Sequence, residues 1–440
     1  MYRHPKSNFR YKSIRDPLYG FIDLSELETR ILDTAVFRRL HSIKQLSHAY
    51  VVYPSAIHTR LEHSLGCLYV ANRMCDELGL TPDETETVRL AALLHDIGHG
   101  PFSHLFENVI KKVNPSLSKP HENITSLLIK EHDELAPIID SRREDIAKLL
   151  IPEKISLFSD HKTSLLSDIV TSGLDADKLD YLRRDSYHIG VAYGQFDLER
   201  ILHTIRRTPI KQSRICIDIK GKDALENYRL GRYLMHVQVY EHHARLVADQ
   251  MFLQALDLAM EEDIMDKSDL TLRKGGSNED FLKFYLSLDD NSIYDIIMQN
   301  KNSTSKEILS NIKQRKLLKR ACEFTLHSIE GHASIGNDLK IMDEDKFSII
   351  ASEVSQEMDL ERHEVIFHKS KIEIKLFREG DILVLKGNDV HDLQGSSPIA
   401  AKDQVFKFYV FGPRDLETRR ILADKIAKRL DVPVNKISSV

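Results

Sequence analysis

The residues with the clearest chemical potential lie in one short stretch, between Leu93 and His104. An apolar helical run ends there in a histidine followed by an aspartate, His95 and Asp96. A neutral imidazole beside a carboxylate is a donor set for Fe, Mn, Ni, Zn or Mg. Adjacent helical side chains point about 100° apart, so these two can share an ion only at the helix end. We therefore predict a divalent metal site there, with further ligands from distant parts of the chain.

Two distant residues are expected to complete the metal site, a histidine before the pair and an aspartate after it. A lone histidine is usually a satisfied polar group, and a lone aspartate is usually a helix cap or a surface charge. However, an ionised Asp96 at the end of an apolar helix needs a compensating partner, and a metal ion is the simplest one. The predicted ligands are His63, His95, Asp96 and Asp177.

Further histidines and a glutamate near the predicted metal site fit proton transfer. Glycines and a proline break the helix after the His-Asp pair, and His99 and His104 follow within a few residues. His121 and Glu122 lie in the first turn of another predicted helix. Because histidine titrates near neutral pH, such groups can move protons or neutralise phosphate charge. In the alternative interpretation, His99 only closes the glycine-rich turn.

Basic and aromatic residues are candidates for binding a polyanionic ligand. Positive charge could come from Arg60, Lys178, Arg232 and His236. The same residues could instead pair with acids on their own helices, such as Asp180 and Glu241. Tyr181 and Tyr240 suit stacking on a base or a sugar, and they suit plain core packing equally well.

Four-residue spacing places several of these groups on common helical faces. One face carries Asp177, Tyr181 and Asp185. A second face, within a long helical run predicted over residues 224–262, carries Arg232, His236 and Tyr240.

Most of the elements that must position these residues are predicted to be helices. Thr81 followed by Pro82 is typical of a helix start, and that helix ends at the His-Asp pair. Ser25 and Glu28 form a candidate capping box. More helices are expected from residue 280 to residue 324. Short strands are expected over residues 15–24 and 211–222.

The last hundred residues change character. Alternating apolar residues predict strands over 371–376, 381–385 and 405–411, with Gly380 between the first two, and an amphipathic helix over 413–430. We therefore predict a mainly α fold class. A helical catalytic domain would span residues 1–335, with its motif region at about 50–185. A small α+β domain would span residues 336–440.

Composition narrows the class of protein. The 42% hydrophobic and 29% charged residues are typical of a soluble globular protein. A net charge of −5 gives no general attraction to nucleic acid or anionic membranes. The four cysteines lack the spacing of a disulfide framework. We expect neither a secretory signal nor a membrane span, and hence a cytoplasmic protein without a membrane partner.

The order of the predicted metal ligands resembles the HD superfamily of metal-dependent phosphohydrolases. Longer strings are similar to the deoxynucleoside triphosphate triphosphohydrolase branch of that superfamily. These strings are Phe37–Leu46, His58–Gly66, His95–His104, Pro120–Glu122, Leu174–Asp185 and Tyr240–His242. The resemblance implies water attack on the α-phosphorus of a dNTP, which releases a deoxynucleoside and inorganic triphosphate.

The resemblance implies a role for each matching position. The metal ligands match the four residues named above. The proton-transfer group matches His104, with His121 and Glu122 near it. The triphosphate contacts match Arg60, His99, Lys178 and Arg232. The pocket for the deoxyribose and base matches Gln45, Leu46, Tyr181, Asp185 and Tyr240.

Relatives in this branch are commonly homo-oligomers, so a tetramer or a dimer is implied. Some relatives bind an activating guanine nucleotide between subunits. Asp33 fits that pattern, whereas Arg38 and His41 stand where an amide and an arginine are expected.

Two other functions stay open. One is an HD phosphohydrolase that acts on another nucleotide or on a phosphodiester, although the Gly-Tyr-Pro signature of cyclic-dinucleotide enzymes does not follow His104. The other is a non-catalytic binder of nucleotides or of single-stranded nucleic acid. The complete set of four metal ligands favours an enzyme.

Overall fold

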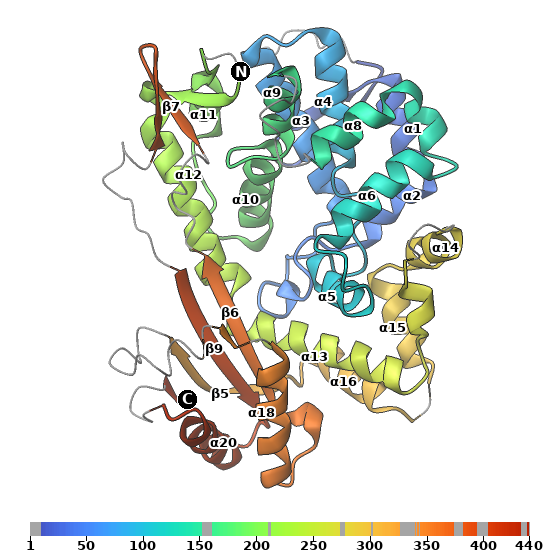
Figure 1. Ribbon diagram of the computed structural model, residues 1–440, viewed down its shortest axis with the longest axis vertical. Helices are drawn as coiled ribbons and strands as arrows, with labels where there is room; N and C mark the ends of the chain where they lie inside the picture. Colours follow the sequence, from blue (N-terminus) through green and yellow to red (C-terminus); the bar gives the residue numbers. More distant parts are fainter. Residues whose placement is uncertain are drawn as a thin grey trace.

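Helices make up most of the described chain in the computed structural model, and its strands form small sheets (Figure 1). The structure describes residues 10–151, 161–209, 213–272, 278–300, 302–325, 339, 341–342, 344–373, 382–393, 404–432 and 438–439. The predicted fold class, mainly α with α+β structure toward the C-terminus, is confirmed.

The helices of the first half of the chain form the upper body in Figure 1. They are α1 (Glu26–Leu32), α2 (Ala35–Arg38), α3 (Arg60–Leu78), α4 (Pro82–Leu94), α5 (His104–Val113), α6 (Pro120–Glu131), α7 (Ala136–Ile139), α8 (Arg143–Leu150), α9 (His161–Val170), α10 (Ala176–Ile189) and α11 (Leu198–Thr204). The short 3₁₀ turns among them are η1 (Arg39–Ser42), η2 (Ala49–Val51) and η3 (Asp140–Arg142).

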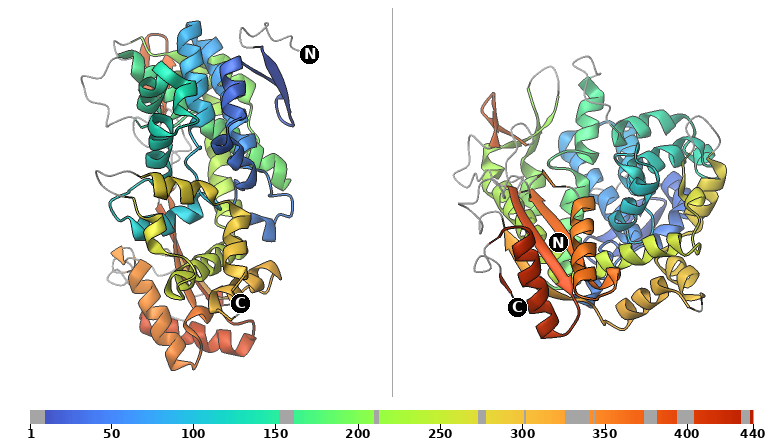
Figure 2. Two further views of the ribbon diagram at one scale, coloured as in Figure 1. Left: turned by 90° about the vertical axis from the view of Figure 1, so that its right-hand side faces the viewer. Right: turned by 60° about the horizontal axis from the view of Figure 1, so that its bottom comes forward.

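An antiparallel hairpin precedes this body. Its strands are β1 (Lys12–Asp16) and β2 (Gly20–Leu24), as the sequence predicted. Figure 2 shows the hairpin standing at the edge of the helical body, close to the N-terminus.

The predicted helix starts are confirmed by their capping contacts. Ser25 and Glu28 form the expected capping box of α1. Thr81 caps α4 together with Glu84, and Pro82 occupies the first helical position. Helix α4 ends at Leu94, directly before the predicted ligands His95 and Asp96. The local sequence therefore determines where the first metal-ligand residues leave their helix.

The single long helix predicted over residues 224–262 is wrong. The chain forms α12 (Lys222–Met235), one π-helical turn η5 (His236–Tyr240) and then α13 (His243–Glu261). A π turn is wider than an α turn, so four-residue spacing no longer fixes one common face. Two contacts stabilise the break: Arg245, in the first turn of α13, donates to the carbonyl of Tyr240, and Ser370 from a distant part of the chain donates to Glu241.

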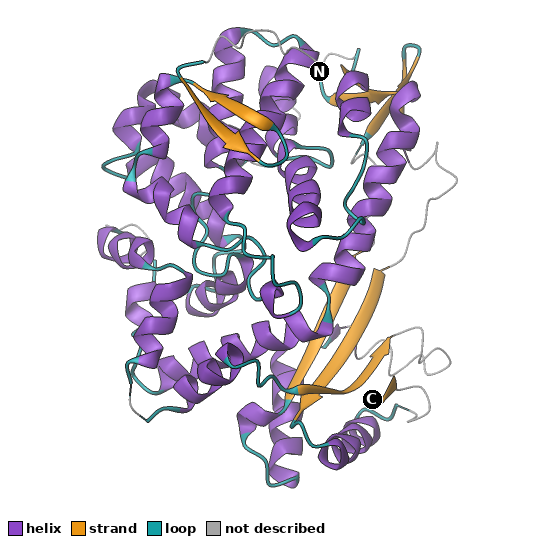
Figure 3. Ribbon diagram, turned by 180° about the vertical axis from the view of Figure 1, so that it is seen from behind, coloured by secondary structure: helices purple, strands orange, loops and turns teal. Residues whose placement is uncertain are grey.

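The remaining elements belong to the second half of the chain, which Figure 3 shows from behind. The helices and 3₁₀ turns are η4 (Ile219–Gly221), η6 (Lys267–Leu270), α14 (Glu279–Ser287), α15 (Asp290–Met298), α16 (Thr304–Lys313), α18 (Glu344–Glu357), η8 (Arg362–Glu364) and α20 (Leu416–Arg429). One sheet has the order β3 (Ile205–Arg207), β4 (Ile215–Asp218), β7 (Leu383–Lys386), β8 (Asp389–Asp392). The other has the order β10 (Ser438–Ser439), β5 (Lys319–Thr325), β9 (Gln404–Gly412), β6 (Ile366–Glu373).

Both four-stranded sheets join strands from either side of the predicted domain boundary near residue 335. Strand β5 pairs antiparallel with β9, and β4 pairs parallel with β7. Residues 326–338 lie outside the described part of the chain, so the boundary itself stays a prediction. The helix expected up to residue 324 is wrong, because long-range pairing with β9 makes residues 319–325 a strand.

The predicted C-terminal strands and helix are largely confirmed. Strand β6 covers the start of the predicted strand over 371–376, and residues 374–376 and Gly380 lie outside the described residues. Strands β7 and β9 and helix α20 lie where the sequence placed them. Within the described residues, no helix combines the length and apolar character needed to span a bilayer.

Helix α3 packs against α10 at its one glycine, Gly66. A Cβ atom there would lie 1.9 Å from Asp180 Oδ1 and 2.3 Å from Arg184 Nη2. Neither side chain is free to move away. Asp180 and Arg184 are fully buried, and Arg184 also pairs with Asp16 at 2.9 Å. The close approach of the two helices therefore requires glycine at this position.

We predict that Gly66→Ala destabilises the protein by about 1–3 kcal/mol, because the new methyl group overpacks the buried Asp180–Arg184 pair. An alanine usually stabilises a helix relative to glycine. A loss of stability would therefore indicate overpacking and not a change in helix propensity. Thermal or urea unfolding of both proteins measures it. A variant that is as stable as the wild type, or more stable, would contradict the packing described here.

Candidate metal centre and proton-transfer cluster

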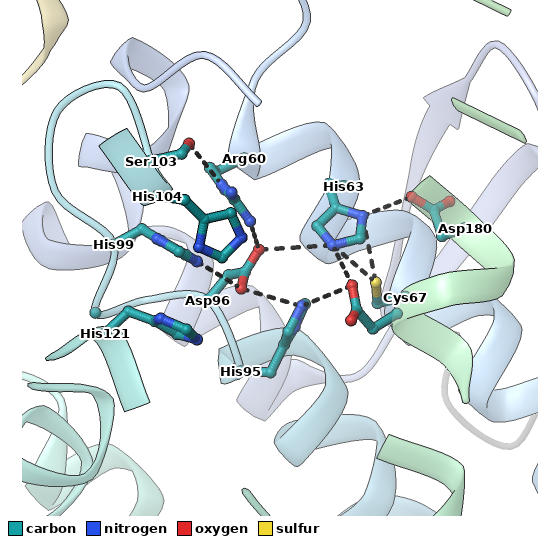
Figure 4. Close-up of polar contacts among 12 residues, drawn as sticks. Arg60, His63, Cys67, His95, Asp96, His99, Ser103, His104, His121 and Asp180 are labelled. Carbon is teal, nitrogen blue, oxygen red and sulfur yellow. Dashed lines mark hydrogen bonds and ion pairs between the residues drawn. The ribbon is translucent and has the colours of Figure 1, made fainter. Parts of the chain in front are cut away.

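Four side chains from three segments converge on one point. His63 of α3 and His95 and Asp96 after α4 face one another (Figure 4). Asp177 of α10 contacts both histidines. His63 Nε2 lies 3.1 Å from Asp177 Oδ1 and 3.5 Å from Asp96 Oδ2. His95 Nε2 lies 3.3 Å from Asp96 Oδ1 and 3.8 Å from Asp177 Oδ1. The structure therefore brings together all four predicted ligands.

The second nitrogen of each histidine fixes the ring so that Nε2 faces the centre. His63 Nδ1 lies 2.8 Å from Asp180 Oδ2, and His95 Nδ1 lies 2.8 Å from the carbonyl of Ala92. Such contacts orient metal-ligating imidazoles. His95 Nε2 is buried and has no hydrogen bond within the described chain. Two imidazole nitrogens and two carboxylates are a suitable set for a divalent cation.

The carboxylates at this point are held in the charged form. Burial works against ionisation, but Arg60, His95 and His99 keep the pKa of Asp96 well below its usual range. Burial likewise opposes ionisation of Asp177, and His63 and His95 keep its pKa low. The compensating partner expected for Asp96 is present in the chain itself, because Arg60 Nη1 contacts Asp96 Oδ2.

Cys67 also lies among the predicted ligands, although no sequence motif indicated it. Its sulfur is 3.5 Å from both ring nitrogens of His63, and it belongs to a possible metal-holding group with His63, His95 and Asp177. Burial raises the pKa of the thiol well above its usual value. Because the thiolate is the metal-binding form, Asp96 is the better fourth ligand.

A second cluster lies beside the first and is centred on Glu107 of α5. Glu107 Oε1 lies 2.6 Å from His104 Nδ1 and 2.9 Å from His121 Nδ1. Burial opposes its ionisation, but these two histidines lower the pKa of Glu107 far below its usual range. The His104 side chain is 69% exposed, so the ring is oriented at one nitrogen and accessible at the other.

The structure corrects the prediction that Glu122 is the acid near His104. Glu122 forms an ion pair with Lys119 at 2.5 Å, whereas Glu107 contacts both predicted proton-transfer histidines. The signal in the sequence was the spacing of His104 and Glu107, which puts them on one face of α5.

The second cluster suits proton transfer better than metal binding. The rings of His99 and His121 are stacked, with centroids 4.2 Å apart and an interplanar angle of 12°. Nitrogen lone pairs lie in the ring plane, so two parallel stacked rings do not aim at a common ion. His99 itself is neutral, because burial, Arg60 and His121 lower its pKa well below the usual value. It can donate a hydrogen bond to a ligand but brings no charge.

Two of the predicted cations, Lys178 and Arg232, are held in the charged form, and His236 is not. Lys178 pairs with Asp175 at 2.6 Å rather than with Asp180, and its pKa is raised despite burial. Tyr181 interacts most strongly with Arg232, whose pKa is also raised. The predicted positive charge on His236 is wrong, because burial and the nearby Arg232 lower its pKa to about 4.

The residues predicted to hold a sugar and base also meet in space. Tyr240 donates to Asp185 Oδ2 at 2.6 Å, and Asp185 Oδ1 lies 2.8 Å from His58 Nε2. The rings of Tyr181 and Tyr240 are edge-to-face, 6.4 Å apart.

Gln45 and Leu46 are buried on the segment before α3. The side-chain oxygen of Gln45 has no hydrogen bond within the described chain, and is therefore available to a ligand. His58, the partner of Asp185, was missed although it stands in the same motif as His63.

Two family models match most of the chain. The HD domain matches residues 60–184, and the HD associated region matches residues 196–436, which is more than half of the protein. This chain belongs to the HD-domain family. The chain is therefore a hydrolase of that family. HD domains are metal-dependent, and the converging histidines and aspartates form a cluster that could hold the metal ion.

Individual relatives of this HD protein span archaea, bacteria and animals. An uncharacterized protein of Methanocaldococcus jannaschii is 29% identical over 438 residues, which is 96% of this chain and 85% of that protein. The deoxynucleoside triphosphate triphosphohydrolase SAMHD1 of Homo sapiens is 32% identical over 346 residues, 70% of this chain. The match spans only 54% of the human protein. A crystal structure of a hypothetical protein from Aquifex aeolicus, 29% identical, aligns with a TM-score of 0.72 over 93% of this chain and 99% of that one.

We predict that Asp177→Ala loses bound metal and activity while the fold survives, because the remaining ligands leave an open coordination shell. Cys67→Ser is the matched control, since Cys67 lies in the same cluster but keeps its proton. Elemental analysis of the purified proteins, with circular dichroism as the check on folding, measures both. Full metal occupancy in Asp177→Ala, or metal loss in Cys67→Ser, would contradict the four-ligand assignment.

Proposed function

We propose that this protein is a metal-dependent dNTP triphosphohydrolase, which cleaves a dNTP to a deoxynucleoside and inorganic triphosphate. The arrangement of α10 supports this most strongly. It carries the ligand Asp177, Tyr181 and the pocket residue Asp185 at four-residue spacing, which is roughly 6 Å of helix per step. A nucleotide with its α-phosphate at the metal centre would therefore extend its sugar toward the Asp185–Tyr240 pair.

The chain supplies the groups for attack at the α-phosphorus. A divalent ion held by the four ligands would polarise the α-phosphate and lower the pKa of the attacking water. His104, with Nδ1 held by Glu107, would give the proton on Nε2 to the departing 5′-oxygen. Arg60, Lys178 and Arg232 would neutralise the charge that develops on the triphosphate.

A relative supports a dNTP as the substrate, although the match covers only 54% of that relative. SAMHD1 is named as a deoxynucleoside triphosphate triphosphohydrolase, and its match spans 70% of this chain. The competing functions are an HD phosphohydrolase with another substrate and a non-catalytic nucleotide or single-strand binder. The oriented His104–Glu107 pair beside the metal ligands favours catalysis over simple binding.

Product analysis tests the proposed function. The purified protein is incubated with each dNTP and with Mn²⁺ or Mg²⁺, and the products are separated by ion exchange. Deoxynucleoside and inorganic triphosphate are the expected products. Diphosphate or monophosphate products would indicate another phosphohydrolase, and binding without turnover would indicate the non-catalytic function.

The homo-oligomer, as a tetramer or a dimer, is also a proposal, and mass photometry would test it. An activating nucleotide stays a prediction. The three positions concerned, Asp33, Arg38 and His41, are all exposed.

We predict that His104→Ala lowers kcat by about 10²–10⁴, since the departing oxygen loses its proton donor. Metal content and substrate binding should stay close to those of the wild type, because His104 is not a metal ligand. Glu122→Ala is the matched control and should keep kcat, because Glu122 pairs with Lys119. Steady-state kinetics measures kcat and KM, and elemental analysis measures the metal content of each variant. Unchanged kcat in His104→Ala would remove this residue from the mechanism.

We predict that dNTPs are cleaved and NTPs are not, because the Tyr240 ring would fill the space of a 2′-hydroxyl while Asp185 pairs with the 3′-hydroxyl. Tyr240→Ala should narrow the ratio of kcat/KM for dGTP over GTP. Tyr240→Phe keeps the ring and should keep most of the ratio, although it loses the hydrogen bond to Asp185. Equal kcat/KM for dGTP and GTP in the wild type would refute the proposed exclusion of ribonucleotides by Tyr240.

A further inference from the structure

The loop that delivers His99 and His104 has a strained backbone. Phe102 and Ser103 adopt φ values of +53° and +58°, which non-glycine residues rarely do. Such a conformation persists only where surrounding contacts enforce it. The position of His104 therefore depends on the contacts that other residues make to this loop.

Groups from distant parts of the chain hold the first half of the loop at its carbonyls. Arg39 Nη2 donates to the carbonyls of His99 at 2.7 Å and of Ile97 at 3.2 Å. The hydroxyl of Tyr285 donates to the carbonyl of Gly98 at 2.9 Å. Tyr285 belongs to α14, in the HD associated region, so that region contacts the loop of the HD domain directly.

One carboxylate, Asp290 at the start of α15, joins the second half of the loop to the predicted nucleotide pocket. Its Oδ1 accepts the backbone N–H of Phe102 at 2.6 Å. Its Oδ2 accepts the backbone N–H of Lys44 at 3.0 Å and lies 3.2 Å from Lys44 Nζ. Lys44 directly precedes Gln45 and Leu46, so a single side chain fixes both segments.

We propose that Asp290 is a positioning residue of this enzyme, which fixes the position of His104 relative to the Gln45–Leu46 segment. This role rests on the proposed function. Asp290 is 1% exposed, and burying a carboxylate for stability alone is unfavourable compared with an apolar residue. Two oxygens that accept from two separate segments are what a tie between those segments needs. The α14–α15 region would thus act on catalysis from outside the HD domain.

A graded pair of variants and a neighbouring control test the proposal. Asp290→Asn keeps the size but has only one acceptor oxygen, and Asp290→Ala has none. Asp289→Ala is the control. The Asp289 carboxylate caps α15 by accepting from the N–H groups of Asn291 and Ser292, and among the described residues it has no hydrogen bond to either segment. Each protein is assayed for metal content, for kcat and KM, and for amide hydrogen exchange of the segments 42–48 and 97–106.

We expect kcat to fall by roughly tenfold to a hundredfold in Asp290→Ala, and by less in Asp290→Asn, at unchanged metal content. Both segments should lose exchange protection together. Asp289→Ala should lower the melting temperature without either effect. In a His104→Ala background, Asp290→Ala should reduce kcat much less than in the wild type, because the group that it positions is gone.

Several results would overturn the role of Asp290. One is unchanged amide hydrogen exchange of the two segments in Asp290→Ala. Another is that Asp289→Ala loses kcat and exchange protection to the same extent. A third is that the effects of Asp290→Ala and His104→Ala on kcat are fully additive. If Asp290→Ala does not fold, the same readouts apply to Asp290→Asn. A wild-type protein without triphosphohydrolase activity would refute the proposed function instead, and the exchange data would still decide whether Asp290 ties the two segments together.

Discussion

The contact between His63 and Asp180 is the interaction on which the rest of the site depends. Asp180 turns the His63 ring so that Nε2 faces the other ligands. Arg184 holds Asp180 through two nitrogens, and Asp16 holds Arg184. Burial alone would raise the pKa of Asp180, but Arg184 and His63 lower it to about 2. A buried network of this kind leaves the ligand one orientation, which is what a preformed metal site requires.

The same constraint explains why elements far apart in sequence must assemble before any chemistry is possible. The metal centre needs α3, the end of α4 and the start of α10, and Gly66 allows the first and last of these to touch. The second half of the chain adds the pocket through Tyr240 and holds the proton-transfer loop through Tyr285. The HD associated region therefore contacts the candidate site directly.

Local patterns predicted the helix starts, the four converging ligands and most C-terminal strands, because caps, periodicity and ordered motifs are short-range signals. The failures have both long-range and local causes. Residues 319–325 form a strand only because β9 pairs with them. The helix over 224–262 breaks where Arg245 and Ser370 satisfy groups at the π turn. Glu107 was missed although it lies three residues after His104 on the same face of α5. Burial and the nearby Arg232 lower the pKa of His236, which the four-residue spacing alone does not show.

In the proposed mechanism, water attacks the α-phosphorus at this metal centre while His104 protonates the 5′-oxygen. Hydrolysis of a dNTP in ¹⁸O-labelled water, followed by mass spectrometry of both products, tests it most directly. Attack at phosphorus predicts one ¹⁸O atom in the inorganic triphosphate and none in the deoxynucleoside. Label in the deoxynucleoside would mean that the C5′–O bond breaks instead, and label in orthophosphate or pyrophosphate would mean attack at another phosphorus. Either result would contradict the mechanism.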